Sequence, residues 1–293
     1  SFAGRPNFQT EWDSSQVNPY RSEANLLMGS FACTQNWNPF LFNWKPIRYD
    51  DRNYADIIRS SFRMNRGHDV NYRPETMNVF QTLARMVLRK DLKESEKGYY
   101  TNRYFGADVY DSTKQGLRAD MRYAACGKSL VTFDDVYFDE DFASNDVLKL
   151  EKYGEKNGRY ISNTDESMVD FNEMIYYVNS PRSQAVTGYN GGKKIELDDV
   201  IFDMETAHST LYMSSLSNDS LTDTDSMLFT YVADSKNNGL KLTDDAREII
   251  QGGTGPILIQ PVIGKITLKS KDTFKVYMTV QNYAVYDIKI TKM

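Results

Sequence analysis

The chain has 293 residues, of which 40% are hydrophobic and 13% aromatic, so it can bury a sizeable core and form two domains. Its formal net charge of -5 argues against a dedicated nucleic-acid surface, which needs clustered lysine and arginine. Only two cysteines and two histidines are present, which excludes a disulfide framework and argues against a histidine-based metal site or catalytic triad.

The first ninety residues alternate between strand and helix patterns. Residues 8–11 are β-prone and precede a polar turn, and the apolar spacing over 20–34 predicts a helix. Residues 40–44 form an apolar run between prolines, which predicts a buried strand, and further helices are expected at 54–63 and 74–89. This order is typical of a parallel α/β fold. The apolar face of the last helix comprises Met77, Phe80, Leu83, Ala84, Val87 and Leu88.

Beyond a charged linker at 90–97, short β-prone runs alternate with glycine, asparagine, aspartate and serine. This pattern is typical of an antiparallel β-sandwich, and Asn190-Gly191-Gly192 is a strong turn signal within it. We therefore predict one domain at 1–90 and a β-sandwich region at 91–293, with a subdomain break near 180–190. The main expected strands lie at 129–133, 173–178, 200–202, 209–213, 227–232, 257–260, 265–268, 274–278 and 285–290.

Five segments of the first region follow one another in a specific order. They are Arg5-Pro6-Asn7-Phe8-Gln9-Thr10-Glu11-Trp12-Asp13, then residues 18–23, 30–38, 40–44 and 77–90. In this order they resemble strand seven, the entry to helix seven, its end and following loop, strand eight and the closing helix of a glycoside hydrolase barrel of clan A. The later segments 177–188, 228–238 and 255–262 resemble the β-domains that follow such barrels in bacterial polysaccharide-degrading enzymes.

The resemblance implies an α/β plus all-β chain, namely the C-terminal portion of a (β/α)8 barrel followed by one or more antiparallel β-sandwich domains. In clan A the nucleophilic glutamate ends strand seven, and a tryptophan after strand eight lines the sugar subsite. The residues at these positions are Glu11 and Trp44. The resemblance also implies a retaining enzyme that degrades a polysaccharide outside the cell, at its surface or in the periplasm.

Each candidate site residue has a functional and a structural interpretation. Glu11 at a strand end would be held rigidly as a nucleophile, or it is an exposed carboxylate. Trp44 offers a flat apolar face to a sugar, or it closes the barrel core. Asn43 donates to a sugar hydroxyl, or it satisfies backbone groups at the strand end. Trp12 and Trp37 are further candidate substrate-binding aromatics, although Trp37 is also expected in a loop.

A retaining mechanism needs two carboxyl groups about 5–5.5 Å apart, and the clan's acid/base glutamate lies on strand four. This sequence has no room for that strand. We therefore expect the N-terminal half of the same polypeptide, or a separate chain, to complete the barrel, and this chain alone to be inactive. The competing hypothesis is a non-catalytic carbohydrate-binding or structural assembly protein built on a barrel remnant.

Several other titratable residues are expected to be structural. Cys33 and Cys126 are expected to be buried free thiols, and His68 and His208 to be surface or hydrogen-bonded residues. Glu23 falls in the first turn of a predicted helix, where a negative side chain favours the helix dipole.

No cofactor, metal, nucleic acid or membrane span is expected. The acidic clusters at 134–135, 139–141 and 198–199 could offer oxygen ligands to Ca²⁺, but their spacing is not that of an EF-hand, and solvated loop carboxylates are the favoured interpretation. The glycine-rich stretch 252–256 lacks the lysine of a phosphate loop, so it is interpreted as a turn. No apolar run approaches the roughly 18 residues of a membrane helix.

Overall fold

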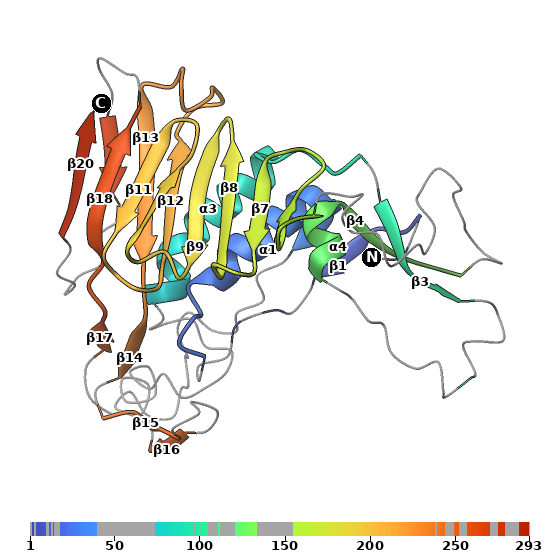
Figure 1. Ribbon diagram of the computed structural model, residues 1–293, viewed down its shortest axis with the longest axis horizontal. Coiled ribbons are helices and arrows are strands. Elements are labelled where there is room, and N and C mark those ends of the chain that lie inside the picture. Colours follow the sequence, from blue (N-terminus) through green and yellow to red (C-terminus); the bar gives the residue numbers. More distant parts are fainter. Residues whose placement is uncertain are drawn as a thin grey trace, which may run out of the picture.

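A computed structural model shows a strand-rich, mixed α/β chain with helices and several antiparallel sheets (Figure 1). At this coarse level the predicted fold class is confirmed. The structure describes residues 2, 4–9, 12, 14, 18–39, 74–96, 98–104, 111, 121–133, 155–237, 239–243, 249–251, 257–269, 275–278 and 287–292. The expected strand at 40–44 and the expected helix at 54–63 lie outside the described residues.

The centre of the fold is an eight-stranded sheet with the order β19-β13-β12-β9-β8-β7-β6-β5. Its neighbours pair antiparallel except for β13 and β19, which are parallel. The strands are β5 (Glu155–Lys156), β6 (Arg159–Ile161), β7 (Ser167–Asp170), β8 (Ile175–Ser180), β9 (Ser183–Gly188), β12 (Ser209–Ser215), β13 (Ser226–Val232) and β19 (Lys275–Met278).

A four-stranded sheet with the order β10-β11-β18-β20 shares a core with one face of the central sheet (Figure 1). Phe202 of the smaller sheet and Phe229 of the central sheet are both fully buried in this core, with Met204, Leu211 and Ile266. The strands of the smaller sheet are β10 (Lys193–Glu196), β11 (Val200–Met204), β18 (Ile263–Leu268) and β20 (Asp287–Lys292).

The other face of the central sheet carries helices α1 (Glu23–Gln35), α3 (Pro74–Arg89) and α4 (Met121–Cys126). Because side chains alternate along a strand, Tyr176 and Tyr212 turn toward the helices, whereas Ile175 and Leu211 turn toward the smaller sheet. The central strands are therefore buried on both faces. Both cysteines are buried thiols of the helical core that form no disulfide, as the sequence predicts.

Helices α1 and α3 approach closely at Gly29 of α1. A Cβ atom at this position would lie 2.4 Å from Leu83 Cδ1 and 3.1 Å from Met86 Sδ, both on α3. A side chain at this position would force Leu83 to shift, so Gly29 favours the close packing of the two helices, although glycine lowers intrinsic helix stability. The sequence predicts a helix over 20–34, and the observed helix ends one residue later, with Asn36 in the left-handed conformation that commonly terminates helices.

Helix α3 has the predicted bounds, but its predicted apolar face is only partly covered. Leu83 is buried against α1, whereas Met77 is 41% exposed and Leu88 is 84% exposed. The burial pattern places Val79 and Met86 on the covered side with Leu83. The periodicity therefore predicts the helix correctly but not which part of its surface is in contact.

A polar row on α3 faces the central sheet. Asn78 Nδ2 donates to the carbonyl of Tyr231 at 2.7 Å, and the hydroxyls of Thr82 and Thr230 lie 3.0 Å apart. Spacings of three and four residues keep this row on one side of the helix. The row also contains Glu75, Arg85 and Arg89.

Two of the parallel strand pairs have a helix between their strands in the sequence. Strand β1 (Asn7–Gln9) pairs with β2 (Trp37–Pro39) around α1. Strand β3 (Gly98–Tyr104) pairs with β4 (Lys128–Phe133), and α4 lies between them in the chain. Parallel neighbours require such crossover connections, so both are β-α-β units. The sequence predicts β1 but places Trp37 in a loop.

Short strands project beyond one end of the central sheet, in the lower part of Figure 1. They pair antiparallel as β14 (Ser235–Asn237) with β17 (Ile257–Ile259), and as β15 (Lys241–Leu242) with β16 (Ile249–Gln251). Strand β14 follows β13 in the chain after a short connection, so the pair β14–β17 begins near the end of β13.

Each expected strand of the β-region overlaps an observed strand, but β5, β6, β7, β9 and β10 are not among the expected ones. Three pairs are parallel where the sequence predicts antiparallel pairing, namely β3 with β4, β13 with β19 and β18 with β20. Alternation of apolar residues specifies the faces of a strand but not its direction. The expected break near 180–190 coincides with the hairpin β8–β9, through which the sheet continues.

The predicted turn at Asn190-Gly191-Gly192 connects β9 to β10. Gly192 has φ of +72°, a conformation that favours glycine. A Cβ atom on Gly191 would lie 2.6 Å from Ala207 Cα, so the backbone of the next loop approaches too closely for any side chain.

Candidate functional site

The first candidate site is the edge at which β1 and β2 end. The parallel register aligns Asn7 with Trp37 and Gln9 with Pro39, so the chain leaves both strands at the same edge. In α/β folds, ligands bind at this carboxyl edge because the variable loops follow the strands there. Glu11 follows β1 in the sequence, and residues 40–44 follow β2.

Three of the predicted site residues, Glu11, Asn43 and Trp44, lie outside the described residues. Trp37 opens β2 and is therefore at the amino end of the strand, opposite Asn7. Trp12 is partly buried, and among the described residues its buried indole N–H has no hydrogen-bond acceptor. A buried donor normally has a partner, so this N–H is suited to an acceptor on a bound ligand.

Buried ionic contacts fix the segment that leads into α1. Arg21 Nε lies 2.9 Å from Glu75 Oε1, and both side chains are almost fully buried. The same guanidinium donates to the carbonyls of Asn18 at 2.9 Å and Ser235 at 2.7 Å, and it pairs with Asp234 at 3.1 Å. Arg21 thus joins the start of α1, the start of α3 and the base of β14.

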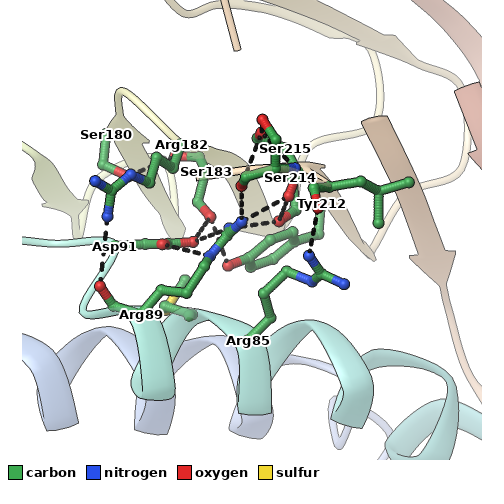
Figure 2. A network of polar contacts seen from close by, with 12 residues as sticks. Arg85, Arg89, Asp91, Ser180, Arg182, Ser183, Tyr212, Ser214 and Ser215 are labelled. Carbon is green, nitrogen blue, oxygen red and sulfur yellow. Dashed lines mark hydrogen bonds and ion pairs between the residues drawn. The ribbon is translucent and has the colours of Figure 1, made fainter. Parts of the chain in front are cut away.

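A second polar network lies at the other end of α3 (Figure 2). Arg89 binds the Asp91 carboxylate through two nitrogens, at 3.0 Å and 2.6 Å. The hydroxyl of Ser183 also donates to Asp91, and Tyr212 donates to Ser183 at 3.1 Å. The charged pair is therefore held by hydroxyl groups from β9 and β12.

Arg89 also binds the end of β12 and the residues after it. Its guanidinium donates to the carbonyls of Ser215 at 2.8 Å and Ser217 at 2.6 Å, and to the Ser214 hydroxyl at 3.1 Å. Arg182 donates in turn to the Arg89 carbonyl at 3.5 Å. We refer to this network as the helix clamp, which comprises Arg89, Asp91, Arg182, Ser183, Tyr212 and Ser214.

The backbone at the end of α3 places Asp91 within the helix clamp. Lys90 has φ of +52°, its N–H donates to the Val87 carbonyl at 3.2 Å, and the Asp91 N–H donates to the Met86 carbonyl at 3.0 Å. These two bonds form a Schellman motif, which satisfies the last carbonyls of a helix. The reversal turns Asp91 back toward Arg89.

The helix clamp is suited to structural support rather than to catalysis. Asp91, Ser183 and Tyr212 are all buried, so these groups do not face a soluble substrate. Burial, reinforced by the charge of Asp91, raises the pKa of Tyr212 well above its ordinary value, so the phenol stays protonated at neutral pH. The clamp therefore fixes α3 to the central sheet.

The helix clamp is absent from the sequence-based predictions. Pro181-Arg182-Ser183 appeared only as one segment of the family resemblance, and Arg89 and Asp91 fell at a helix end and in a predicted charged linker. The only sequence signal for this network is a basic residue in the last helical turn followed by an acidic residue, a pattern that favours an ion pair at the helix end. Their partners on β9 and β12 are far away in the chain, so only the tertiary structure brings the group together.

As the sequence predicts, Glu23 lies in the first turn of a helix and His208 has a hydrogen-bonding partner. Glu23 is the first residue of α1, and its carboxylate lies 3.4 Å from Nε2 of His208. Within the described part of the chain, no cluster of three or more histidine, cysteine, aspartate or glutamate residues is placed to hold a metal ion.

Comparisons with protein-family models, curated proteins and solved structures found no match. Among the described helices, none combines the length and apolar character needed to cross a membrane.

Proposed function

We propose that this chain is part of a retaining glycoside hydrolase that cleaves a polysaccharide. Glu11 is the nucleophile, and Trp12, Asn43 and Trp44 are the candidate sugar-binding residues, whereas Trp37 lies at the amino end of β2 and is not part of this set. The acid/base carboxyl group is supplied by the N-terminal half of the same polypeptide or by a separate chain that completes the barrel. In this proposal β1, α1 and β2 belong to the end of a (β/α)8 barrel, and the two stacked sheets form the β-sandwich region.

The observation that carries this proposal is the parallel pairing of β1 and β2 around α1. This β-α-β unit is the repeating element of a (β/α)8 barrel. The two strands end at one edge, and the candidate nucleophile and candidate stacking tryptophan follow those ends in the sequence. The indole N–H of Trp12, which has no acceptor among the residues that the structure describes and is next to Glu11 in the sequence, adds a donor suited to a sugar oxygen or a carboxylate.

The proposed chemistry has two steps. The Glu11 carboxylate attacks the anomeric carbon and forms a glycosyl ester, while the acid/base group protonates the departing oxygen. The same group then removes a proton from water, which attacks the anomeric carbon and releases Glu11. The configuration at the anomeric carbon is retained because it is inverted twice.

The decisive variant is Glu11→Gln in the complete protein. Loss of the nucleophile should lower turnover of the polysaccharide by at least about a thousandfold while leaving sugar binding largely intact. Glu173→Gln is the matched control, since Glu173 is an exposed residue paired with Lys193 at 2.8 Å. Reducing-end release measures turnover, and affinity electrophoresis measures binding.

Azide rescue separates a nucleophile from a structural carboxylate. In the Glu11→Gly variant, azide should enter the vacated space, attack the anomeric carbon and give a glycosyl azide of inverted configuration. Full turnover by Glu11→Gln would refute the proposal. Sugar binding without any turnover by the complete wild-type protein would instead support the carbohydrate-binding alternative.

A further inference from the structure

Three aromatic rings meet where the loops of the central sheet approach the first turn of α1. Tyr20 precedes α1, Tyr189 follows β9, and His208 precedes β12. The ring centroids of Tyr20 and His208 are 4.7 Å apart, and Tyr189 lies 5.4 Å from each of the other two rings. The Tyr189 hydroxyl donates to the Tyr20 hydroxyl. We refer to Tyr20, Tyr189 and His208 as the ring cluster.

The ring cluster is held in place by hydrogen bonds of the neighbouring loops and is partly exposed to solvent. Asn190 and Ser209 exchange two hydrogen bonds of 2.9 Å, which tie the loop after β9 to the start of β12. The Tyr189 N–H donates to the Met174 carbonyl at 3.0 Å. Tyr189 nevertheless remains 37% exposed. A binding surface benefits from this arrangement because rigid supports reduce the entropy lost on binding.

Polar groups surround the exposed aromatic surface. The side chain of Glu23 is 35% exposed, and its carboxylate lies 3.4 Å from the His208 ring. The hydroxyls of Tyr20 and Tyr189, which are hydrogen-bonded to each other, belong to the same cluster. The exposed part of Tyr189, the Glu23 carboxylate and the tyrosine hydroxyls offer both apolar contact and hydrogen bonds, the combination that orients a ligand in a binding site, whereas the His208 side chain is only 11% exposed and supports the other groups.

The ring cluster lies on the side of α1 expected for substrate. Residues 10–22 connect the carboxyl end of β1 to the beginning of α1, so this connection belongs to the strand-to-helix loops. Such loops build the catalytic face of a barrel. Tyr20 and Glu23 stand at the helix end of this connection, and Tyr189 and His208 add residues from the central sheet.

We propose that the ring cluster binds a sugar unit of a neutral polysaccharide, away from the unit cleaved at Glu11. The inference rests on the proposed function and extends it to a site shared by the β1–α1 loop and the central sheet. A neutral chain is favoured because Glu23 lies beside the rings and the protein has a net charge of -5. An anionic polymer would be repelled.

Affinity electrophoresis of the full chain tests the inference with three soluble probes, laminarin, neutral xylan and polygalacturonate. At least one neutral polymer should retard the wild-type chain, whereas polygalacturonate should not. Tyr189→Ala should weaken the apparent affinity about threefold to tenfold, which is the usual range for one aromatic contact. Tyr189→Phe should retain most binding because it keeps the ring.

Phe171→Ala is the matched control. Phe171 is another exposed aromatic residue of the central sheet region, but its ring packs on Tyr160 at 5.4 Å outside the ring cluster. This variant should bind like the wild type. Thermal unfolding of each variant shows whether a binding loss comes from unfolding, and Tyr189→Leu gives a second substitution that removes the flat ring but keeps an apolar side chain.

The inference is overturned if neither neutral polymer retards the wild-type chain, or if folded Tyr189→Ala and Tyr189→Leu bind like the wild type. Equal losses in Tyr189→Ala and Phe171→Ala would also overturn it. Failure of the proposed function is a separate result, since it appears as Glu11-independent hydrolysis, or as sugar binding without hydrolysis, by the complete protein. Glu11-dependent hydrolysis with unchanged Tyr189→Ala binding rejects the ring cluster alone.

Discussion

Asp91 illustrates how one residue can connect distant parts of this chain. Its buried carboxylate accepts bonds from Arg89 on α3 and Ser183 on β9. A buried ion pair is costly to desolvate, and its partners recover that cost only when the geometry is complete. Removing the charge of Asp91 should therefore lower the free energy of unfolding more than removing the charge of a typical surface aspartate.

Asp91→Asn should lower the free energy of unfolding by about 3–5 kcal/mol, because Arg89 would keep a poorly compensated charge against the sheet. Urea denaturation at neutral pH measures the change. Asp198→Asn serves as the control, because Asp198 is an exposed residue on the turn between β10 and β11. A loss below about 1 kcal/mol for Asp91→Asn would show that the helix clamp does not stabilise the fold.

At the scale of elements, α3 uses its polar side for sheet contact and part of its apolar side for α1. Its polar row binds backbone and hydroxyl groups of β12 and β13, while Leu83 packs against Gly29. Met77 and Leu88 remain exposed on the described surface. Hydrogen-bond partners on the sheet therefore decide how the helix is rotated, in addition to its hydrophobic pattern.

A matched pair of substitutions tests this rotation. Leu83→Ala should lower the free energy of unfolding by about 2–5 kcal/mol because it opens a cavity beside α1. Leu88→Ala should change it by less than about 0.5 kcal/mol because the Leu88 side chain is 84% exposed. Urea denaturation compares the two variants. Similar losses at both positions would contradict the described orientation of α3.

At the scale of the whole molecule, the central sheet is shared by two cores. Tyr176 and Tyr212 belong to the core on the helical side, and Ile175 and Leu211 belong to the core between the sheets. Both cysteines lie in the helical core. Burial is the main cause that raises the pKa of Cys33 to about 12, so its thiol stays protonated at neutral pH.

Thiol labelling can report whether the helical layer and the sheets unfold together. At pH 8 neither cysteine should react with a disulfide reagent in the folded protein, because both are buried and Cys33 is protonated. Along a urea titration, labelling should appear at the same concentration as the loss of far-UV circular dichroism. Cys33→Ala and Cys126→Ala report each thiol separately, and labelling at lower urea would reveal independent opening of the helical layer.

The sequence by itself determined part of the fold. Proline and apolar spacing specify α3, short β-prone runs specify strands such as β8, β11, β12 and β13, and Asn190-Gly191-Gly192 specifies a turn, because these signals act between residues close in the chain. The candidate nucleophile Glu11 also comes from the sequence, through its position after a β-prone run and the family resemblance, and it remains a prediction.

Only the tertiary structure decided how the elements face one another. It buried the central sheet on both sides, made β19 and β20 parallel to their neighbours, and joined Arg89 and Asp91 to Ser183. It also brought Tyr20 beside Tyr189 and His208. These contacts depend on partners far apart in sequence, and local periodicity specifies a surface without specifying what will cover it.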